Sequence, residues 1–269
     1  MDIIQTITLA IIQGLTEFLP ISSSGHLVLV PVVTGWQDQG LALDVATHVG
    51  TLAAVVFYFR QDILNISRDG VLSIFNKTHT QDSKRFYMLL IATIPVGLAG
   101  ILLADFIENN LRSSVVIAIT SIGFGLLLYF ADITGSKQRH DKSINFKDAI
   151  YIGLAQILAL IPGTSRSGIT MTAGLMLGLS RKASARFSFL LAIPVIFLAG
   201  AYEIYKLLRE PAIANWHDIF VAATVAAVVA SLCIHFFLKI IDKIGMLPFV
   251  LYRIILGIAL LAVVYLESI

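Results

Sequence analysis

Long apolar runs alternate with short polar segments along most of this chain. A helix needs about 20 largely apolar residues to cross the hydrocarbon layer of a membrane. Runs of roughly this length occur in six places, and each one predicts a membrane-spanning helix. The predicted spans cover residues 41–60, 86–104, 114–131, 184–205, 217–238 and 249–266.

Two other apolar regions, residues 3–33 and 149–178, are interrupted by polar turns. The first turn reads PISSSGH and the second reads PGTSRSG. The apolar pieces on either side cover 3–19 and 27–33, then 149–161 and 169–178. Irregular backbone at membrane depth is tolerated only where it is buried in protein or lines a wet cavity. Both regions therefore predict re-entrant helical hairpins, which enter the membrane and return to the same side.

Composition agrees with an all-α integral membrane protein. The chain has 269 residues, of which 57% are hydrophobic and 13% are charged, and its mean hydropathy is +0.87. Since soluble domains run at about 25% charged residues, the solvent predicted here is membrane lipid. The net charge of +2 is too small to indicate a nucleic-acid partner. Cys233 is the lone cysteine, which excludes an internal disulfide and a cysteine-rich metal site. We see no cleavable signal and predict a single membrane domain over residues 1–269.

The distribution of Lys and Arg predicts how the chain is threaded. These residues concentrate in short cytoplasmic loops of membrane proteins. If the 61–85 loop is cytoplasmic and both hairpins are re-entrant, most of the 19 Lys and Arg residues fall on the cytoplasmic side. The bias collapses if either hairpin is a full crossing. Both termini are then predicted to be periplasmic, and Tyr252 and Arg253 are interpreted as a cytoplasmic anchor of the last span.

The two interrupted regions resemble each other and predict an internal repeat. QGLTEFLPISSSG begins at Gln13, and QILALIPGTSRSG begins at Gln156. Each hairpin is followed by three predicted spans, so the second half is inserted upside down. We predict an inverted-topology repeat, with repeat one at about 1–131 and repeat two at about 149–269. Broken helices of such repeats bring functional residues together near the midplane, where the two turns are expected to meet.

The polar turns supply the candidate chemistry. The first region offers an amide, a carboxylate, hydroxyls and an imidazole, from Gln13, Glu17, Ser22, Ser23, Ser24 and His26. The second offers hydroxyls and a guanidinium, from Thr164, Ser165, Arg166 and Ser167. An Arg fork matches phosphate oxygens, helix N-termini bind anions, and His titrates near neutrality. An acid, a possible nucleophile, an imidazole and an anion clamp together indicate phosphoryl transfer.

Each of these residues also has a purely structural interpretation. Glu17 and Arg166 can form an ion pair that only joins the two repeats, and His26 can cap a half-helix. Single serines often bond to a helix carbonyl in membranes. Gln13 can be an interhelical hydrogen-bonding group. Outside the turns, Asp44 and His48 are four residues apart, so they face either the same cavity or the membrane interface.

At these motifs the sequence resembles the bacterial undecaprenyl-pyrophosphate phosphatase family, the bacitracin-resistance proteins. The family motif of Glu or Gln, three residues and Glu stands here as QGLTE, from Gln13 to Glu17. The motif PGxSRSxxT stands as PGTSRSGIT, from Pro162 to Thr170. The resemblance covers essentially the whole chain, including FSFLLAIP at 187–194 and the YR pair near the end. Gln at position 13 departs from the most familiar form, although the family pattern admits it.

The resemblance implies hydrolysis of undecaprenyl pyrophosphate, a polyprenyl lipid, to the monophosphate and inorganic phosphate. The implied place is the periplasmic face of the bacterial inner membrane, where the reaction recycles the lipid carrier for cell-wall synthesis. A divalent cation, Mg²⁺ or Ca²⁺, is also implied, with Glu17 as its ligand or as a base. Ser23 matches a proposed nucleophile, His26 the essential histidine, and Arg166 a phosphate-binding residue. The remaining motif positions are expected to bind substrate: Gln13, Ser22, Ser24, Thr164, Ser165, Ser167 and Thr170.

The residues alone leave three questions open. Ser23, His26, Glu17 or water can each be the nucleophile. An inverted-repeat transporter or polyprenyl-lipid flippase is the alternative function, because broken helices are above all a transporter architecture. Small residues such as Gly97, Gly100, Gly123 and Gly125 allow close helix packing, within one protomer or in a homodimer.

Overall fold

The computed structural model describes residues 2–36, 40–77, 79–209 and 216–267. Within these ranges the chain is helical, and extended pairing is limited to an isolated bridge between Arg139 and Leu179. The helices are α1 (Ile3–Thr16), α2 (Ser23–Thr34), α3 (Gly40–Tyr58), α4 (Arg60–Asn76), α5 (Gln81–Asn110), α6 (Ser114–Thr134), η1 (Asp141–Ser143), α7 (Phe146–Gln156), η2 (Ile157–Leu160), α8 (Arg166–Met176), α9 (Arg181–Arg209), α10 (Trp216–Ile244) and α11 (Leu247–Glu267).

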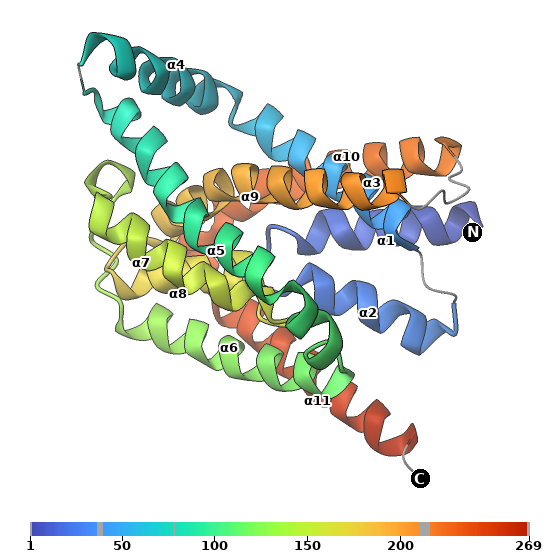
Figure 1. Cartoon of the computed structure of the whole chain (residues 1–269). Helices are drawn as coiled ribbons and strands as arrows, with labels where there is room; N and C mark the ends of the chain where they lie inside the picture. Colours follow the sequence, from blue (N-terminus) through green and yellow to red (C-terminus); the bar gives the residue numbers. More distant parts are fainter. Residues whose placement is uncertain (1, 37–39, 78, 210–215, 268–269) are drawn as a thin grey trace.

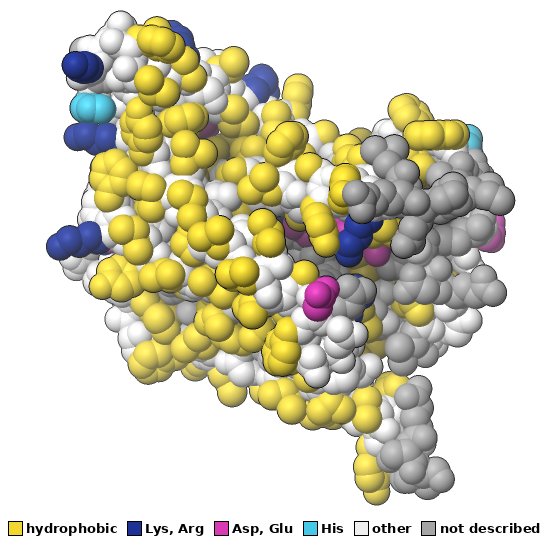
Figure 2. Space-filling model, in the orientation of Figure 1, with side chains coloured by type: hydrophobic (Ala, Val, Ile, Leu, Met, Phe, Trp, Pro, Cys, Tyr) yellow, Lys and Arg dark blue, Asp and Glu magenta, His cyan; other side chains and the backbone are white. Residues whose placement is uncertain are grey.

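The prediction of spanning helices is confirmed for all six runs. Among the described residues, six helices are long and apolar enough to cross a membrane: α3, α5, α6, α9, α10 and α11. Hydrophobic side chains cover most of the face shown in Figure 2. The chain is therefore a multi-pass, all-α membrane protein.

The two interrupted regions fold as helical hairpins. α1 and α2 approach from the end of the molecule at which the N-terminus lies, and their connecting turn reaches the middle of the molecule (Figure 1). α7, η2 and α8 form a second hairpin that approaches from the opposite end, and its turn also lies in the middle. The last described helix, α11, ends on the same side as the N-terminus.

The polar turns are shorter than the sequence pattern predicts. α2 begins at Ser23 and α8 begins at Arg166, so most of the polar residues lie in a first helical turn and not before it. Serine explains the difference, because it is among the best residues for the N-cap position. Ser22 caps α2 by accepting a hydrogen bond from the Gly25 amide, and Ser165 caps α8 through the Gly168 amide.

The end of the molecule opposite the two termini carries most of the Lys and Arg side chains visible in Figure 2. The segment predicted only as a loop between the first two spans contains the helix α4, in which charged residues lower the mean hydropathy below that of a spanning helix. Ion pairs tie the connections together at this end. Arg181 binds both Asp132 carboxylate oxygens at 2.6 and 2.9 Å, and Arg139 binds those of Asp148 at 3.0 and 2.6 Å.

Close helix packing holds the first hairpin in place. A Cβ on Gly14 of α1 would lie 2.8 Å from the Val229 Cβ, and one on Gly50 of α3 would lie 2.2 Å from the Ala223 carbonyl oxygen. Because neither glycine has a side chain, α1 and α3 both lie directly against α10. Just beyond α1, the fully buried Phe18 ring packs edge-on against Phe189 with centroids 5.2 Å apart. These contacts fix the position of the neighbouring Glu17.

Candidate active site

The two turns share one unusual backbone conformation. Ser22 has φ 72° and ψ 93°, and Ser165 has φ 68° and ψ 113°. Residues other than glycine seldom adopt such angles, which cost about 1–3 kcal/mol and concentrate at functional sites. Each serine also lies close to the second serine after it, with Oγ–Oγ distances of 3.3 Å to Ser24 and 3.2 Å to Ser167. Ser22 and Ser165 are therefore equivalent positions, and so are Ser23 and Arg166, which follow them.

The two equivalent residues reach the same carboxylate. The Ser23 hydroxyl donates to Glu17 Oε2 at 2.7 Å, and Arg166 Nη2 donates to Glu17 Oε1 at 2.9 Å. A second bond joins the hairpins, from the Ser167 hydroxyl to the Leu19 carbonyl at 2.8 Å. Direct contacts between residues about 150 positions apart in the chain thus confirm the prediction that the two turns meet.

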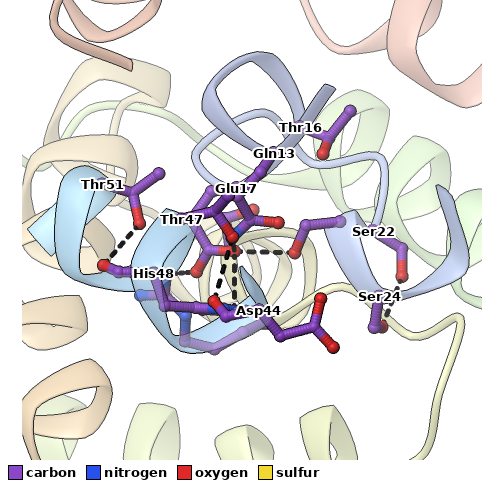
Figure 3. Close-up of polar contacts among 12 residues, drawn as sticks. Gln13, Thr16, Glu17, Ser22, Ser24, Asp44, Thr47, His48 and Thr51 are labelled. Atoms are coloured by element: carbon purple, nitrogen blue, oxygen red, sulfur yellow. Dashed lines mark hydrogen bonds and ion pairs between the residues drawn. The ribbon is translucent and has the colours of Figure 1, made fainter. Parts of the chain in front are cut away.

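Glu17 is the centre of this polar cluster (Figure 3). Its carboxylate also accepts a hydrogen bond from Gln13 Nε2 at 3.0 Å, one helical turn earlier. His48 of α3 brings its Nε2 to 3.9 Å from Glu17 Oε2, so His48 faces the site and not only the interface. Glu17 is only 8% exposed. A buried carboxylate is stable only when charged or polar donors surround it, and here four side chains do so.

His26 lies in the first turn of α2 and is held from both ring nitrogens. Nδ1 lies 2.7 Å from the carbonyl oxygen of Ser22, which is the residue with the unusual backbone. Nε2 lies 2.5 Å from the hydroxyl of Tyr252 on α11. The imidazole is 7% exposed, so its orientation is set by protein groups and not by bulk water.

Arg253, next to Tyr252 on α11, forms hydrogen bonds with the backbone of both turns. It is fully buried, and its guanidinium donates to backbone carbonyls of four residues. The acceptors are Ser121 at 3.0 Å, Gly163 at 3.0 Å, Pro20 at 3.4 Å and Thr120 at 3.4 Å. Pro20 precedes the first turn's Ser22, and Gly163 precedes Ser165. One cation therefore satisfies carbonyls that the breaks in both helices leave without helical partners.

Three buried polar atoms beside Glu17 and in the second turn have no hydrogen-bond partner: Gln13 Oε1, Thr164 Oγ1 and Arg166 Nη1. Buried polar groups of native proteins are almost always paired, so unpaired ones need an explanation. A bound anion would pair with the hydroxyl and the guanidinium, and a bound cation or donor would pair with the amide oxygen.

The other predicted binding residues are distributed around this centre. Ser24 is exposed at the start of α2, while Ser165 and Ser167 are buried in the second turn. Thr170 lies one turn further along α8, and its hydroxyl contacts the Ser188 hydroxyl of α9 at 2.7 Å. The same hydroxyl also donates to the Arg166 carbonyl at 2.9 Å. Thr170 thus joins α8 to α9 and supports the backbone of Arg166, and no hydrogen bond joins it to Glu17 itself.

Comparison with known proteins identifies the family. Residues 6–259 match the family described as Bacitracin resistance protein BacA. The chain belongs to this family. It is 53% identical to Undecaprenyl-diphosphatase 2 of Stutzerimonas stutzeri, over 97% of this chain and 98% of that protein. It is 55% identical to Undecaprenyl-diphosphatase of Thioalkalivibrio sulfidiphilus, with the same coverage. It is 52% identical to Undecaprenyl-diphosphatase of Nitrosococcus oceani, over 96% and 97%.

In this BacA-family chain the sequence pattern gives a wrong role for Arg253. The residue is not a surface anchor of the last span, because it is buried among the carbonyls of both turns. The positive-inside rule assigned it to the cytoplasmic end by its place near the start of an apolar run. A contrary signal was present, since a charged residue within a predicted span is by default functional. The anchor role is also incomplete for Tyr252, because its hydroxyl contacts His26 of the first hairpin.

A divalent cation can be tested against the donors of this BacA-family site. Hard cations prefer oxygen ligands, and the Glu17 carboxylate and the unpaired Gln13 Oε1 are such oxygens. Within the described ranges, no group of three or more His, Cys, Asp and Glu side chains could hold a metal ion. Mg²⁺ commonly takes one or two protein ligands and completes its shell with substrate phosphates and water. The residues fit a cation bound in that way.

Proposed function

We propose that this protein hydrolyses undecaprenyl diphosphate to undecaprenyl phosphate and inorganic phosphate. The observation that carries the proposal is the carboxylate of Glu17, which receives the hydroxyl of Ser23 from one hairpin and the guanidinium of Arg166 from the other. A nucleophile, its base and an anion-binding group thus share one buried site. Relatives named undecaprenyl-diphosphatase match nearly the full chain at about half identity, which supports the lipid substrate.

We further propose that the two hairpins are re-entrant and that the chain is an inverted repeat with periplasmic termini. The matching geometry of Ser22 and Ser165 supports this interpretation. So do the helix contacts, since α1 packs on α10 of the second half as α7 packs on α5 of the first. The Lys and Arg residues at the end opposite the termini support a cytoplasmic location of that end, and thus an inner-membrane protein whose site opens to the periplasm.

The site binds the diphosphate through the second turn. Arg166 keeps Nη1 unpaired while Nη2 holds Glu17, so its fork can bind a phosphate oxygen without releasing the carboxylate. The N-termini of α2 and α8 add free amides and partial positive charge at the same place. The isoprenoid tail remains among the lipid-facing helices, which have an apolar surface.

Ser23 is the proposed nucleophile, because its hydroxyl already donates to the carboxylate that would act as its base. Its oxygen attacks the terminal phosphorus, its proton passes to Glu17, and undecaprenyl phosphate leaves with the electrons of the broken P–O bond. Water then attacks the phosphorus of the phosphoserine while His26 accepts the proton of the water. The bond from phosphorus to the Ser23 oxygen breaks, the serine oxygen takes its proton back from Glu17, and inorganic phosphate leaves. A phosphoenzyme that is lost in Ser23→Ala but retained in His26→Ala supports this order, and the reverse result makes histidine the nucleophile.

A divalent cation, Mg²⁺ or Ca²⁺, is proposed as the cofactor, and Glu17 and Gln13 would hold it through their side-chain oxygens. When bound, such an ion neutralises phosphate charge. The residues of this chain have the other tasks: Arg166 orients the diphosphate, and Glu17 accepts the proton that Ser23 loses on attack.

A homodimer is proposed as a partner arrangement. A Cβ on Gly97 of α5 or on Gly123 of α6 would meet no other atom within 4 Å, so these glycines do not serve packing inside the protomer. They leave flat strips on which a second copy can pack closely. Native mass spectrometry of the detergent-extracted protein tests this arrangement, and a strictly monomeric mass would exclude it under those conditions.

The test of function is phosphate release from a polyprenyl diphosphate by purified protein in detergent, with divalent ion present. Glu17→Ala and Arg166→Ala should each lose about 100-fold or more of the activity, since each removes a charge from the reacting centre. Glu203→Ala, near the outer end of α9, and Arg68→Ala, exposed on α4, are matched controls that should keep it. A transporter would release no phosphate in detergent, and activity that survives both site changes would refute the site.

A further inference from the structure

The contact between Tyr252 and His26 is not used by the chemistry described so far. These residues are 226 positions apart, on α11 and α2, and their Oη and Nε2 atoms are 2.5 Å apart. Their rings are also nearly parallel, with an interplanar angle of 7° and centroids 5.4 Å apart. Two independent contacts thus join the same side chains.

The partners fix the protons on the imidazole of His26. The Ser22 carbonyl at 2.7 Å can only accept, so Nδ1 carries a hydrogen. In the neutral ring, Nε2 is then the acceptor and takes its hydrogen bond from the tyrosine O–H. The structure therefore defines one tautomer, in which Nε2 is the basic nitrogen.

The position of Tyr252 is itself fixed by its neighbour. Arg253 holds α11 against the backbone of both turns, through Pro20 on one side and Gly163 on the other. Since adjacent residues on one helix cannot move independently along it, the tyrosine hydroxyl keeps its place relative to the first turn. Arg253 thus fixes the position of Tyr252, and the carbonyl of Ser22, with its unusual backbone angles, fixes the position of His26.

We propose that Tyr252 is a positioning residue for the hydrolysis, which holds the imidazole of His26 in one orientation and gives up Nε2 to the attacking water when the proton is transferred. The proposal rests on the role given to His26 above. Tyr252 acts through the histidine and needs no contact with the substrate. In a catalytic triad the carboxylate holds the nitrogen that does not transfer the proton. Here the Ser22 carbonyl has that place, and Tyr252 holds the other nitrogen before the reaction.

The test uses Tyr252→Phe, which keeps the ring and its stacking and removes only the hydroxyl. We expect kcat for diphosphate hydrolysis to fall about tenfold, as for the loss of one hydrogen bond, with KM within about twofold of wild type. Tyr58→Phe is the matched control, because Tyr58 also lies beside a histidine, His235, but meets it edge-on at 6.3 Å. That variant should keep the wild-type kcat.

A second readout does not depend on activity. Diethyl pyrocarbonate reacts with an unprotonated imidazole nitrogen, and in the wild type the Nε2 lone pair of His26 is bound to the tyrosine. Mass spectrometry of the modified protein should show His26 reacting several times faster in Tyr252→Phe, while His235 reacts at an unchanged rate in both proteins. An unchanged rate at His26, or a kcat within about twofold of wild type, overturns the proposal.

A His26→Ala variant separates the two levels of the interpretation. If His26→Ala retains wild-type activity, the role of the histidine in the proposed mechanism fails, and with it the reason for a positioning residue. If His26→Ala is inactive while Tyr252→Phe is as fast as wild type, only the inference about Tyr252 fails.

Discussion

At the scale of single residues, the site depends on positions that look unremarkable in the sequence. Ser22 and Ser165 combine a capping hydroxyl with positive φ, and this combination turns the next side chain toward Glu17. Neither the turn geometry nor its recurrence in the second turn can be read from residue types, because serine normally avoids such angles. The sequence pattern shows which residues are polar, but not which of them point to the same atom.

Arg253 allows a prediction at this scale. Replacing it by Lys keeps the charge but cannot reproduce a planar fork that reaches several carbonyls. Each carbonyl left unpaired in a buried site costs about 1–3 kcal/mol, so Arg253→Lys should lower the melting temperature of the detergent-solubilised protein markedly. Arg68→Lys, a conservative change at a largely exposed position of α4, should leave the melting temperature unchanged.

The result for Arg253→Lys can be checked by the thermal unfolding of both variants in one detergent, with phosphate release measured beside it. A melting temperature equal to that of the wild type would mean that the carbonyls of the two turns do not need the guanidinium. The structural role assigned to Arg253 would then be wrong.

At the scale of helices, the spans were predictable and the ends of the broken helices were not. Continuous apolar runs define the six spans, since their length alone distinguishes them. The broken helices extend further into the polar turns than their apolar residues do, because the caps come from serine hydroxyls and not from hydrophobic periodicity. The apolar runs do not predict α4, because its charged residues interrupt any run of membrane-spanning length.

Close packing of α3 on α10 leads to a second prediction. A Cβ at Gly50 would lie 2.2 Å from the Ala223 carbonyl oxygen, which is backbone and cannot turn away. Gly50→Ala should therefore separate these helices and destabilise the protein by about 1–3 kcal/mol, as overpacking does elsewhere. Because α1 also packs on α10, where Ala226 lies close to both Gly14 and Gly50, activity should fall together with stability.

Gly200 in α9 provides the matched control, since a Cβ there would meet no atom within 4 Å. Gly200→Ala should be neutral or stabilising by up to about 1 kcal/mol, because alanine favours the helix over glycine. Thermal unfolding of both variants in the same detergent checks the pair. Equal effects of the two changes would show that the helices can adjust their separation freely.

At the scale of the whole molecule, the proposed function depends on bringing together two hairpins that are far apart in the chain. The repeated pattern of Gln, Pro and Ser-Gly was enough to predict that the polar turns meet. It was not enough to predict that α11, in the last part of the chain, supplies both the tyrosine and the arginine that support them. These contacts join segments that are far apart in the sequence, and the residues next to Tyr252 and Arg253 do not predict them.

The proposed threading yields the last prediction, on the orientation of the whole chain in the membrane. If the basic end is cytoplasmic, a residue near the N-terminus is periplasmic and one on α4 is not. Asp2 and Arg68 are both exposed, and Cys233 can first be replaced by Ser to give a cysteine-free background. In intact spheroplasts, an impermeant maleimide should label Asp2→Cys and should label Arg68→Cys only after the membrane is opened. A re-entrant first hairpin leaves the N-terminus on the side of the membrane opposite α4. Labelling of both variants before the membrane is opened, or of Arg68→Cys alone, would therefore contradict the proposed topology.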